Sequence, residues 1–236
     1  MEPIMHSLLA ISIASSLSAG QIWIHEGQPA QVVELFTSEG CSSCPPADRY
    51  LSKLENSEGL WTSIIPIAYH VDYWDHLGWK DKFAKPEYSQ LQRLYYAYDL
   101  VGSVYTPGFV VDGREWRGFF NWVNRELPAA TPRESQRLKL IRKGNTFSLQ
   151  FDKAGSFDAT LVFLANNQYT QVQRGENRGR KLEHDFIAVK RMQQRSTDGK
   201  WEFEAQLPLE TIDAVAAWVS EPGRFEHIQT VAGKIE

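Results

Sequence analysis

Two cysteines separated by two residues have the clearest chemical potential in this sequence. Cys41 and Cys44 stand in the segment CSSCPP and are the two cysteines of the chain. A lone CxxC is typical of a redox-active dithiol or of half a metal site. A structural zinc ion needs about four ligands, and the sequence offers neither a second CxxC nor histidines spaced as HxxxH. We therefore interpret the pair as a dithiol and expect no metal and no cofactor.

The dithiol lies between a predicted strand and a predicted helix. Residues 31–38 form an apolar, β-branched run typical of a strand, and residues 47–54 carry apolar side chains at helical spacing. At a helix N-terminus, unpaired N–H groups and the helix dipole favour a thiolate. We expect Cys41 to be the nucleophile, as the first and more exposed of the two thiols, and Cys44 to resolve the mixed disulfide. Glu39 acts against this, because a nearby carboxylate raises the pKa of a thiol.

The elements that must position this dithiol alternate between strand and helix. Further strands are predicted at residues 63–71 and 108–111, with helices inside 80–100 and over 119–127. Asp112-Gly113 predicts a hairpin that returns the chain as a strand over 114–118. Such alternation favours a mixed sheet flanked by helices. We assign this α/β domain to residues 28–130.

The pattern of apolar and polar residues changes after a short polar linker that contains prolines. Several runs alternate apolar with polar or small residues, and Ser196 to Gly199 supplies a turn between two of them. These runs cover residues 146–151, 159–165, 186–192, 201–207 and 214–219. Short strands at such spacing are typical of a β-sandwich. We therefore predict a β-rich, sandwich-like region over residues 136–236.

Polar residues that follow the second predicted strand are expected near the dithiol. In an open α/β sheet, ligands bind at the carboxyl ends of the parallel strands. His70 there can stabilise or protonate a leaving thiolate, and Asp72 can accept the proton of Cys44. The alternative is that both are simply hydrogen-bonded structural residues.

Two other groups of residues suggest binding. Tyr73, Trp74 and Trp79, together with Tyr105, can form an aromatic wall for a peptide or an apolar ligand; the alternative is a loop packed over the sheet. The segment RGENRGRK contains Arg178 and Arg180, which can bind an anion or latch the two regions together. Its alternative is a solvated hairpin loop.

The segment VYTPGFVVDGR strengthens the redox interpretation. Thr106-Pro107 directly precedes the strand at 108–111, and this order resembles the thioredoxin superfamily, in which a cis-proline faces the dithiol. More closely, FTSEGCSSCPPAD, HVDYWDHLGWKD, VYTPGFVVDGR and RGENRGRKLEH resemble the bacterial exported "domain of unknown function 1223" family. The resemblance implies a thioredoxin-like fold with an appended β-rich region, and site residues Cys41, Cys44, Thr106 and Pro107. Ser42-Ser43 and the following prolines depart from ordinary thioredoxins.

Composition and charge narrow the partners and the location. The formal net charge is −4 and 42% of residues are hydrophobic, so the basic footprint of a nucleic-acid-binding protein is missing. Residues 8–17 match the apolar core of a signal peptide, although no Lys or Arg precedes Arg49. We predict a signal peptide over residues 1–20 and a periplasmic or secreted protein without a stable membrane span after cleavage. A buried N-terminal helix is the alternative.

Three functions stay open at this point. The leading hypothesis is a thiol-disulfide oxidoreductase that acts on protein or small-molecule thiols and disulfides with an unknown redox partner. The second is a binding protein on the same scaffold, whose CxxC is a structural disulfide or binds a soft metal such as Cu(I). The third is an interaction module centred on the β-rich region.

Overall fold

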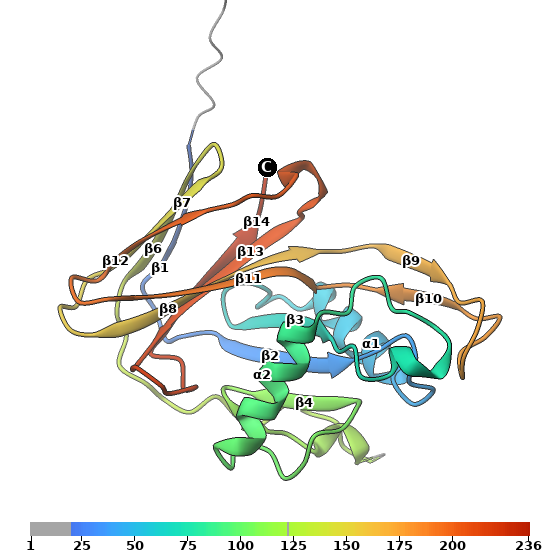
Figure 1. Cartoon of the computed structure of the whole chain (residues 1–236). Coiled ribbons are helices and arrows are strands. Elements are labelled where there is room, and N and C mark those ends of the chain that lie inside the picture. Colours follow the sequence, from blue (N-terminus) through green and yellow to red (C-terminus); the bar gives the residue numbers. More distant parts are fainter. Residues whose placement is uncertain (1–19, 122) are drawn as a thin grey trace, which may run out of the picture.

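The computed structural model describes residues 20–121 and 123–236 as a mixed α/β protein with few helices and mostly β-structure. Its strands form three sheets, of eight, four and two strands. Figure 1 shows the large sheet crossing the whole molecule, with the small four-stranded sheet at one end. The predicted signal peptide lies outside the described residues, apart from Gly20.

One half of the large sheet contains the segments predicted to surround the dithiol. Its strands are β2 (Gln31–Thr37), β3 (Ile64–His70), β4 (Gly108–Val111) and β5 (Arg114–Glu115). β3 runs parallel to β2, whereas β4 is antiparallel to β2 and forms a hairpin with β5. Asp112 and Gly113 both have positive φ, at 50° and 80°, as a two-residue hairpin turn of this type requires. The predicted strands and the Asp-Gly turn are thus confirmed here.

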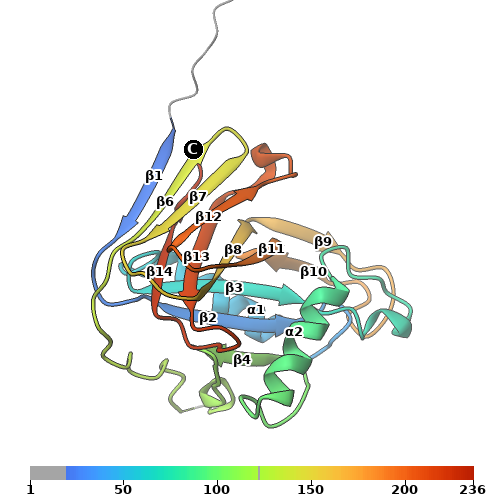
Figure 2. The ribbon, with the colours of Figure 1, turned by 60° about the vertical axis from the view of Figure 1, so that its left-hand side comes forward.

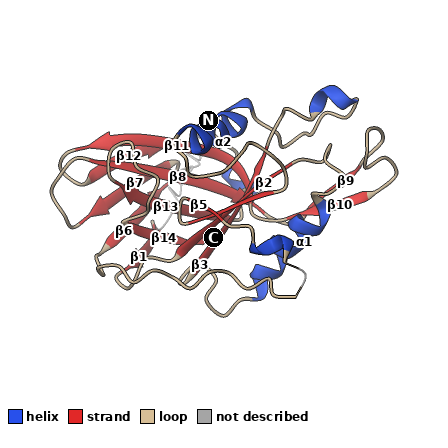
Figure 3. Ribbon diagram, turned by 90° about the horizontal axis from the view of Figure 1, so that it is seen from below, coloured by secondary structure: helices blue, strands red, loops and turns tan. Residues whose placement is uncertain are grey.

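Two helices cover opposite faces of this half of the sheet (Figure 3). Helix α1 (Pro45–Ser52) begins with two prolines, whose fixed φ suits the first helical turn. It buries Ala47 and Leu51 in the same cluster as Phe109 of β4. Helix α2 (Pro86–Ala97) buries Tyr88, Leu91 and Tyr95, which recur at helical spacing, on the other face.

The β-rich half consists of two sheets packed face to face (Figure 2). Strands β8 (Phe157–Ala165), β11 (Ile187–Ser196), β13 (Ala214–Ser220) and β14 (Gln229–Lys234) complete the large sheet. Strands β1 (Gln21–His25), β6 (Leu138–Lys143), β7 (Thr146–Phe151) and β12 (Lys200–Glu204) form the smaller one. The core between them includes Leu140, Phe147, Phe163 and Val215. β1 was not predicted, and it brings the start of the described chain into the β-rich half.

A short parallel contact joins the two halves into one sheet. Ile187 of β11 pairs with Ala68 of β3, and the Ala68 N–H donates to the Phe186 carbonyl at 2.8 Å. The core cluster that includes the buried face of α2 contains residues of both halves, such as Val32 of β2 and Trp218 of β13. The division into domains at residues 28–130 and 136–236 stays a prediction.

A separate hairpin completes the topology. Strands β9 (Gln168–Gln171) and β10 (Lys181–His184) pair only with each other among the described strands. The hairpin packs on α1, and Figure 1 shows it extending on the same side of the molecule as α1. It therefore reaches the carboxyl end of β2, where the cysteines lie.

The predicted helix over residues 119–127 is wrong. The chain forms a short 3-10 helix, η3 (Gly118–Phe120), and the described residues from 121 to 137 contain no helix or strand. Phe120 and Val123, expected on one buried face of that helix, are 41% and 96% exposed, whereas Phe119 is buried against Tyr50 and Phe109. Aromatic packing of residue 119 on other segments therefore replaces the helical face. The strand predicted at 114–118 is also shorter.

Candidate functional site

Cys41 and Cys44 form a disulfide where β2 leads into α1. Their Cα atoms are 5.4 Å apart, and Cys44 is the N-cap residue of α1. Cys41 is 1% exposed and Cys44 is fully buried. Cys41 was expected to be the more exposed of the two thiols, but both residues are buried in this oxidised state. Its neighbours Ser42 and Ser43 are the exposed part of the loop.

The start of α1 provides fewer amide donors than a typical helix. Pro45 and Pro46 have no N–H, and the amides of Ala47 and Asp48 are used by the Cys44 carbonyl. The Ser43 hydroxyl lies 3.4 Å from the Cys41 sulfur. A Cys41 thiolate would thus depend on this hydroxyl and on the dipole of a short helix.

The cis-proline loop lies beside the dithiol loop, with Trp74 between them. The Thr106–Pro107 peptide bond is cis, as the resemblance implied. The Trp74 indole N–H donates to the Thr106 hydroxyl at 2.8 Å. On its other side, a Cβ added to Gly40 would lie 2.9 Å from the Trp74 Cβ. This close approach requires glycine directly before Cys41.

Gln92 of α2 ties two of the predicted aromatic residues together. It accepts from the Tyr73 hydroxyl at 3.1 Å and donates to the Tyr105 carbonyl at 2.6 Å. The Tyr105 hydroxyl donates to Glu115 at 2.7 Å, and burial raises the pKa of Tyr73 to about 12. Tyr73, Trp74 and Tyr105 thus support the cis-proline loop, and their role in binding a ligand stays a prediction.

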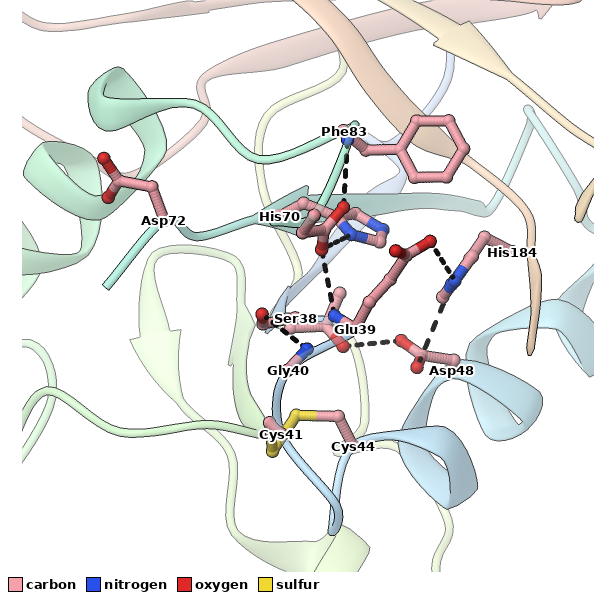
Figure 4. Close-up of polar contacts among 12 residues, drawn as sticks. Ser38, Glu39, Gly40, Cys41, Cys44, Asp48, His70, Asp72, Phe83 and His184 are labelled. Atoms are coloured by element: carbon pink, nitrogen blue, oxygen red, sulfur yellow. Dashed lines mark hydrogen bonds and ion pairs between the residues drawn. A yellow bond between two sulfur atoms is a disulfide. The ribbon is translucent and has the colours of Figure 1, made fainter. Parts of the chain in front are cut away.

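A buried group of acids and histidines lies behind the disulfide (Figure 4). Nδ1 of His70 is 2.7 Å from Oδ2 of Asp81, and both side chains are fully buried. Burial opposes the charged ring, but the Asp81 carboxylate and its hydrogen bond outweigh this and raise the pKa of His70. Burial likewise opposes the Asp81 carboxylate, yet His70 and the amides of Glu39 and Phe83 lower its pKa. The pair is therefore stabilised in its ionised form.

His184 of β10 connects this pair to two further carboxylates. Its Nε2 lies 3.4 Å from Oε1 of Glu39, and its Nδ1 lies 4.0 Å from Oδ2 of Asp48. The His184 and His70 rings meet edge to face with centroids 4.8 Å apart. Burial raises the pKa of Asp48, whose other oxygen accepts from Thr37 at 2.7 Å. Asp48 therefore holds its proton to a higher pH than an ordinary aspartate, one helical turn after Cys44.

Trp79 belongs to this group rather than to an open aromatic wall. Its indole N–H donates to Oε2 of Glu39 at 2.7 Å. In contrast, Asp72 lies apart from the buried group in Figure 4 and accepts from the Ser89 hydroxyl of α2. Asp72 is therefore outside the buried group, and its role as acceptor of the Cys44 proton stays a prediction. Asp48, one helical turn after Cys44, belongs to the buried group.

The loop between β9 and β10 touches the dithiol segment. The Asn177 side chain is fully buried and donates to the carbonyls of Glu39 and Cys41, at 2.8 and 2.9 Å. Glu176 accepts from the Ser42 N–H at 3.1 Å. Arg180 contacts this region only through Asn177, to which it donates at 2.8 Å. Asn177 and Glu176 thus make the direct contacts that the arginine latch was predicted to make. The Arg178 side chain is exposed.

Sequence reasoning missed four residues of this site: Asp48, Asp81, Asn177 and His184. A signal was present for each of them, because all four stand in segments that carried the family resemblance. Asp48 stands in FTSEGCSSCPPAD, Asp81 in HVDYWDHLGWKD, and Asn177 and His184 in RGENRGRKLEH. Within residues 20–121 and 123–236, no three His, Cys, Asp or Glu side chains are arranged to hold a metal ion. No helix of the described chain is long and apolar enough to cross a membrane.

Fold and site together define a mixed α/β protein with a buried CxxC disulfide whose loop is linked through Trp74 to a cis-proline loop. The chain belongs to the family described as "Protein of unknown function (DUF1223)", whose model matches residues 32–220. No curated protein matches it.

Two solved structures resemble the chain. Protein AGR_C_4864 from Agrobacterium tumefaciens is 22% identical with a TM-score of 0.59, covering 88% of this chain and 94% of that one. HBP35 of Porphyromonas gingivalis is 18% identical with a TM-score of 0.55, covering 89% and 76% respectively. At these identities the likeness concerns the fold.

Proposed function

We propose that this protein is a thiol-disulfide oxidoreductase of thioredoxin-like fold that acts on protein or small-molecule thiols and disulfides. One observation carries the proposal. The Cys41–Cys44 disulfide at the start of α1 is linked through Gly40 and Trp74 to the cis Thr106–Pro107 loop, and it lies in front of a buried group of titratable residues. A purely structural disulfide needs neither of these neighbours.

The arrangement of the first half supports the thioredoxin-like part of the proposal. The chain order is β2, α1, β3, α2, β4 and β5, and the strand order within the sheet is β3-β2-β4-β5. The CxxC follows the first of these strands, and the cis-proline precedes β4. The helix expected after the hairpin is replaced by the short η3.

The reaction begins with a partner thiolate attacking the Cys41 sulfur. A bond forms between the partner sulfur and Cys41, the Cys41–Cys44 bond breaks, and its electron pair stays on Cys44. A second thiolate of the partner then attacks the partner sulfur that is bonded to Cys41, and the Cys41 thiolate is released. The partner leaves oxidised, and the protein leaves as a dithiol.

Each released thiolate near neutral pH needs a proton or a stabilising charge. Asp48 is buried in the turn that follows Cys44, and the His184 ring lies between it and Glu39. This group can donate a proton to the Cys44 thiolate when the disulfide opens. It can take the proton back when the disulfide forms.

A disulfide-transfer assay tests the proposal. In one reaction, the purified chain is incubated with insulin and dithiothreitol. In a separate reaction, it is incubated with an unfolded protein whose native disulfides have been reduced. We expect Cys41→Ser to abolish both activities, and the exposed Ser42→Ala to retain them as the matched control. Absence of both activities in the wild-type protein would remove the proposed enzyme function.

A structural or binding role for the CxxC is the second candidate, favoured by the burial of both sulfurs. The reduction potential separates the two roles. Structural disulfides have potentials below about −300 mV, whereas catalytic ones lie at roughly −120 to −270 mV. Binding of Cu(I) to the reduced protein, measured by competition with a chelator, covers the soft-metal version of this candidate.

We also propose that the protein is exported, on the basis of its N-terminal sequence and its disulfide. Cell fractionation with mass analysis of the mature N-terminus checks this. Recovery of the uncleaved chain from the cytoplasm alone would contradict it.

A further inference from the structure

The loop between β9 and β10 crosses the only part of the chain that carries cysteine. We call residues 172–180 the strap. Two backbone bonds close its base, from Val172 N–H to the Arg180 carbonyl and from Gly179 N–H to the Val172 carbonyl. Among the described strands, the flanking β9 and β10 make no ladder with the other two sheets. The strap can therefore move without breaking hydrogen bonds of the large sheet.

Side chains of the strap hold the dithiol segment at three points. Asn177 donates to the carbonyls on either side of Gly40, those of Glu39 and Cys41. Glu176 accepts from the amide of Ser42. The strap thereby grips the segment from Glu39 to Ser42, immediately around the sulfur expected to react.

The strap also rests on the loop that carries Trp79. A Cβ added to Gly175 would lie 3.3 Å from the Trp79 Cβ, and Gly175 has a φ of +73°. Trp79 in turn donates to Glu39. The strap is therefore packed against a second loop that also contacts the dithiol segment.

Disulfide exchange requires an incoming thiolate to reach a sulfur in line with the S–S bond. Cys41 is only 1% exposed, and Cys44 is fully buried. Cys44 lies at the start of α1 against the core and cannot become accessible without local unfolding. Cys41 can, because the loop that follows it is exposed and the strap is held beside it by a few side-chain hydrogen bonds.

We propose that the strap determines which thiol partners reach Cys41, and that Asn177 is the positioning residue that fastens it. A small thiol needs a small opening, whereas a folded protein partner must displace the strap. Loss of the Asn177 bonds removes this selection. The selection among thiol partners rests on the proposed function. The shielding of Cys41 by the strap can be measured on the disulfide of this protein alone.

The test compares two reductants of different size on the oxidised full chain. Second-order rates of reduction of Cys41–Cys44 by dithiothreitol and by a purified reduced thioredoxin are measured by acid quenching, alkylation and mass spectrometry. The variants are Asn177→Ala and Glu176→Ala, with the exposed Arg174→Ala as the control in the same loop. We expect Asn177→Ala to raise the ratio of the protein rate to the dithiothreitol rate at least tenfold. Glu176→Ala raises it less, and Arg174→Ala leaves it at the wild-type value.

A ratio in Asn177→Ala equal to that of the wild type overturns the inference, whether both rates stay constant or rise together. An equal rise in Arg174→Ala also overturns it. If Asn177→Ala does not fold by circular dichroism, the exposed Glu176→Ala decides in the same way. The assay reads reduction of this protein's own disulfide, so its outcome is independent of whether the chain reduces insulin.

Discussion

At the scale of single residues, the buried carboxylate Asp48 connects the chemistry of the dithiol to the stability of the fold. Burial raises its pKa despite the nearby histidines and the Thr37 hydrogen bond. A carboxyl whose pKa is raised in the folded state binds a proton that the unfolded chain releases. Stability therefore falls as the pH rises from about 4, the ordinary value for aspartate, through the folded-state pKa.

Asp48→Asn is expected to change stability and activity in opposite directions. Asn cannot ionise but still accepts from Thr37, so the variant is more stable than the wild type at neutral pH. This advantage grows as the pH rises above about 4 and vanishes at lower pH. Loss of the proton donor lowers the rate of disulfide exchange by about a hundredfold.

Urea unfolding at pH 4 and pH 7, together with exchange rates at pH 7, measures both effects. A variant that is less stable than the wild type at pH 7, or that keeps its full exchange rate, would contradict the role given to Asp48. Thr37→Val is the matched comparison, since it removes the hydrogen bond and leaves the carboxyl.

The residues of the site differ in how far the sequence could predict them. Cys41, Cys44 and Thr106-Pro107 are readable because their spacing and order along the chain have a meaning of their own. The contacts of His184 with Glu39 and Asp48 are not, because these partners come from distant segments that only the folded sheet brings together. Asp72 was chosen by its place after a strand, yet its side chain turns to Ser89 of α2.

At the scale of elements, helix α2 positions the cis-proline loop through one buried side chain. Gln92 is 2% exposed and bonds to both Tyr73 and Tyr105. Gly108 lies against the same amide, since an added Cβ would be 3.2 Å from Gln92 Nε2. The start of β4 is thus fixed against α2.

Gln92→Ala is expected to destabilise the protein by about 1–3 kcal/mol, because it removes a buried side chain and leaves the partly buried Tyr105 carbonyl without its donor. Urea unfolding measures the change, and Gln90→Ala, exposed in the same helix, serves as the control. Equal stability of the two variants would show that the loop does not depend on this bond.

Hydrophobic periodicity predicts some elements of this chain and fails for others. β4 and α2 were predicted because a short apolar run and a helical stripe each reflect burial of one face. The helix over 119–127 fails because Phe119 packs on Tyr50 and Phe109, which are distant in sequence. β1 was missed because Ile22 and Ile24 are half exposed and only Trp23 is buried between them.

At the scale of the whole molecule, the eight-stranded sheet carries the chain from one half to the other. β11 pairs with β3, and the cluster around α2 contains Leu164 and Trp218 from the β-rich half. Both halves therefore lose buried apolar surface if they separate. The change in sequence pattern after the linker predicts the β-rich region. It does not predict that strands of both halves join in one sheet.

The chain is accordingly expected to unfold in one cooperative step. Hydrogen exchange with mass spectrometry at increasing urea follows peptides from β2 and from β13. Both should reach their limiting exchange rate at the same urea concentration, because the seam between β3 and β11 couples them. Exchange of β2 at clearly lower urea than β13 would instead indicate two independent units.

The reactivity of Cys41 towards iodoacetamide tests the central claim most directly. In Cys44→Ser, Cys41 is the one remaining thiol, and its labelling rate between pH 5 and pH 10 gives its pKa, with labelling in guanidinium as the unfolded reference. A redox-active cysteine at a helix N-terminus titrates well below the ordinary value of about 8.5, so we expect a midpoint near or below pH 7. A midpoint near pH 9, or a thiol that is never labelled in the folded protein, would contradict the account.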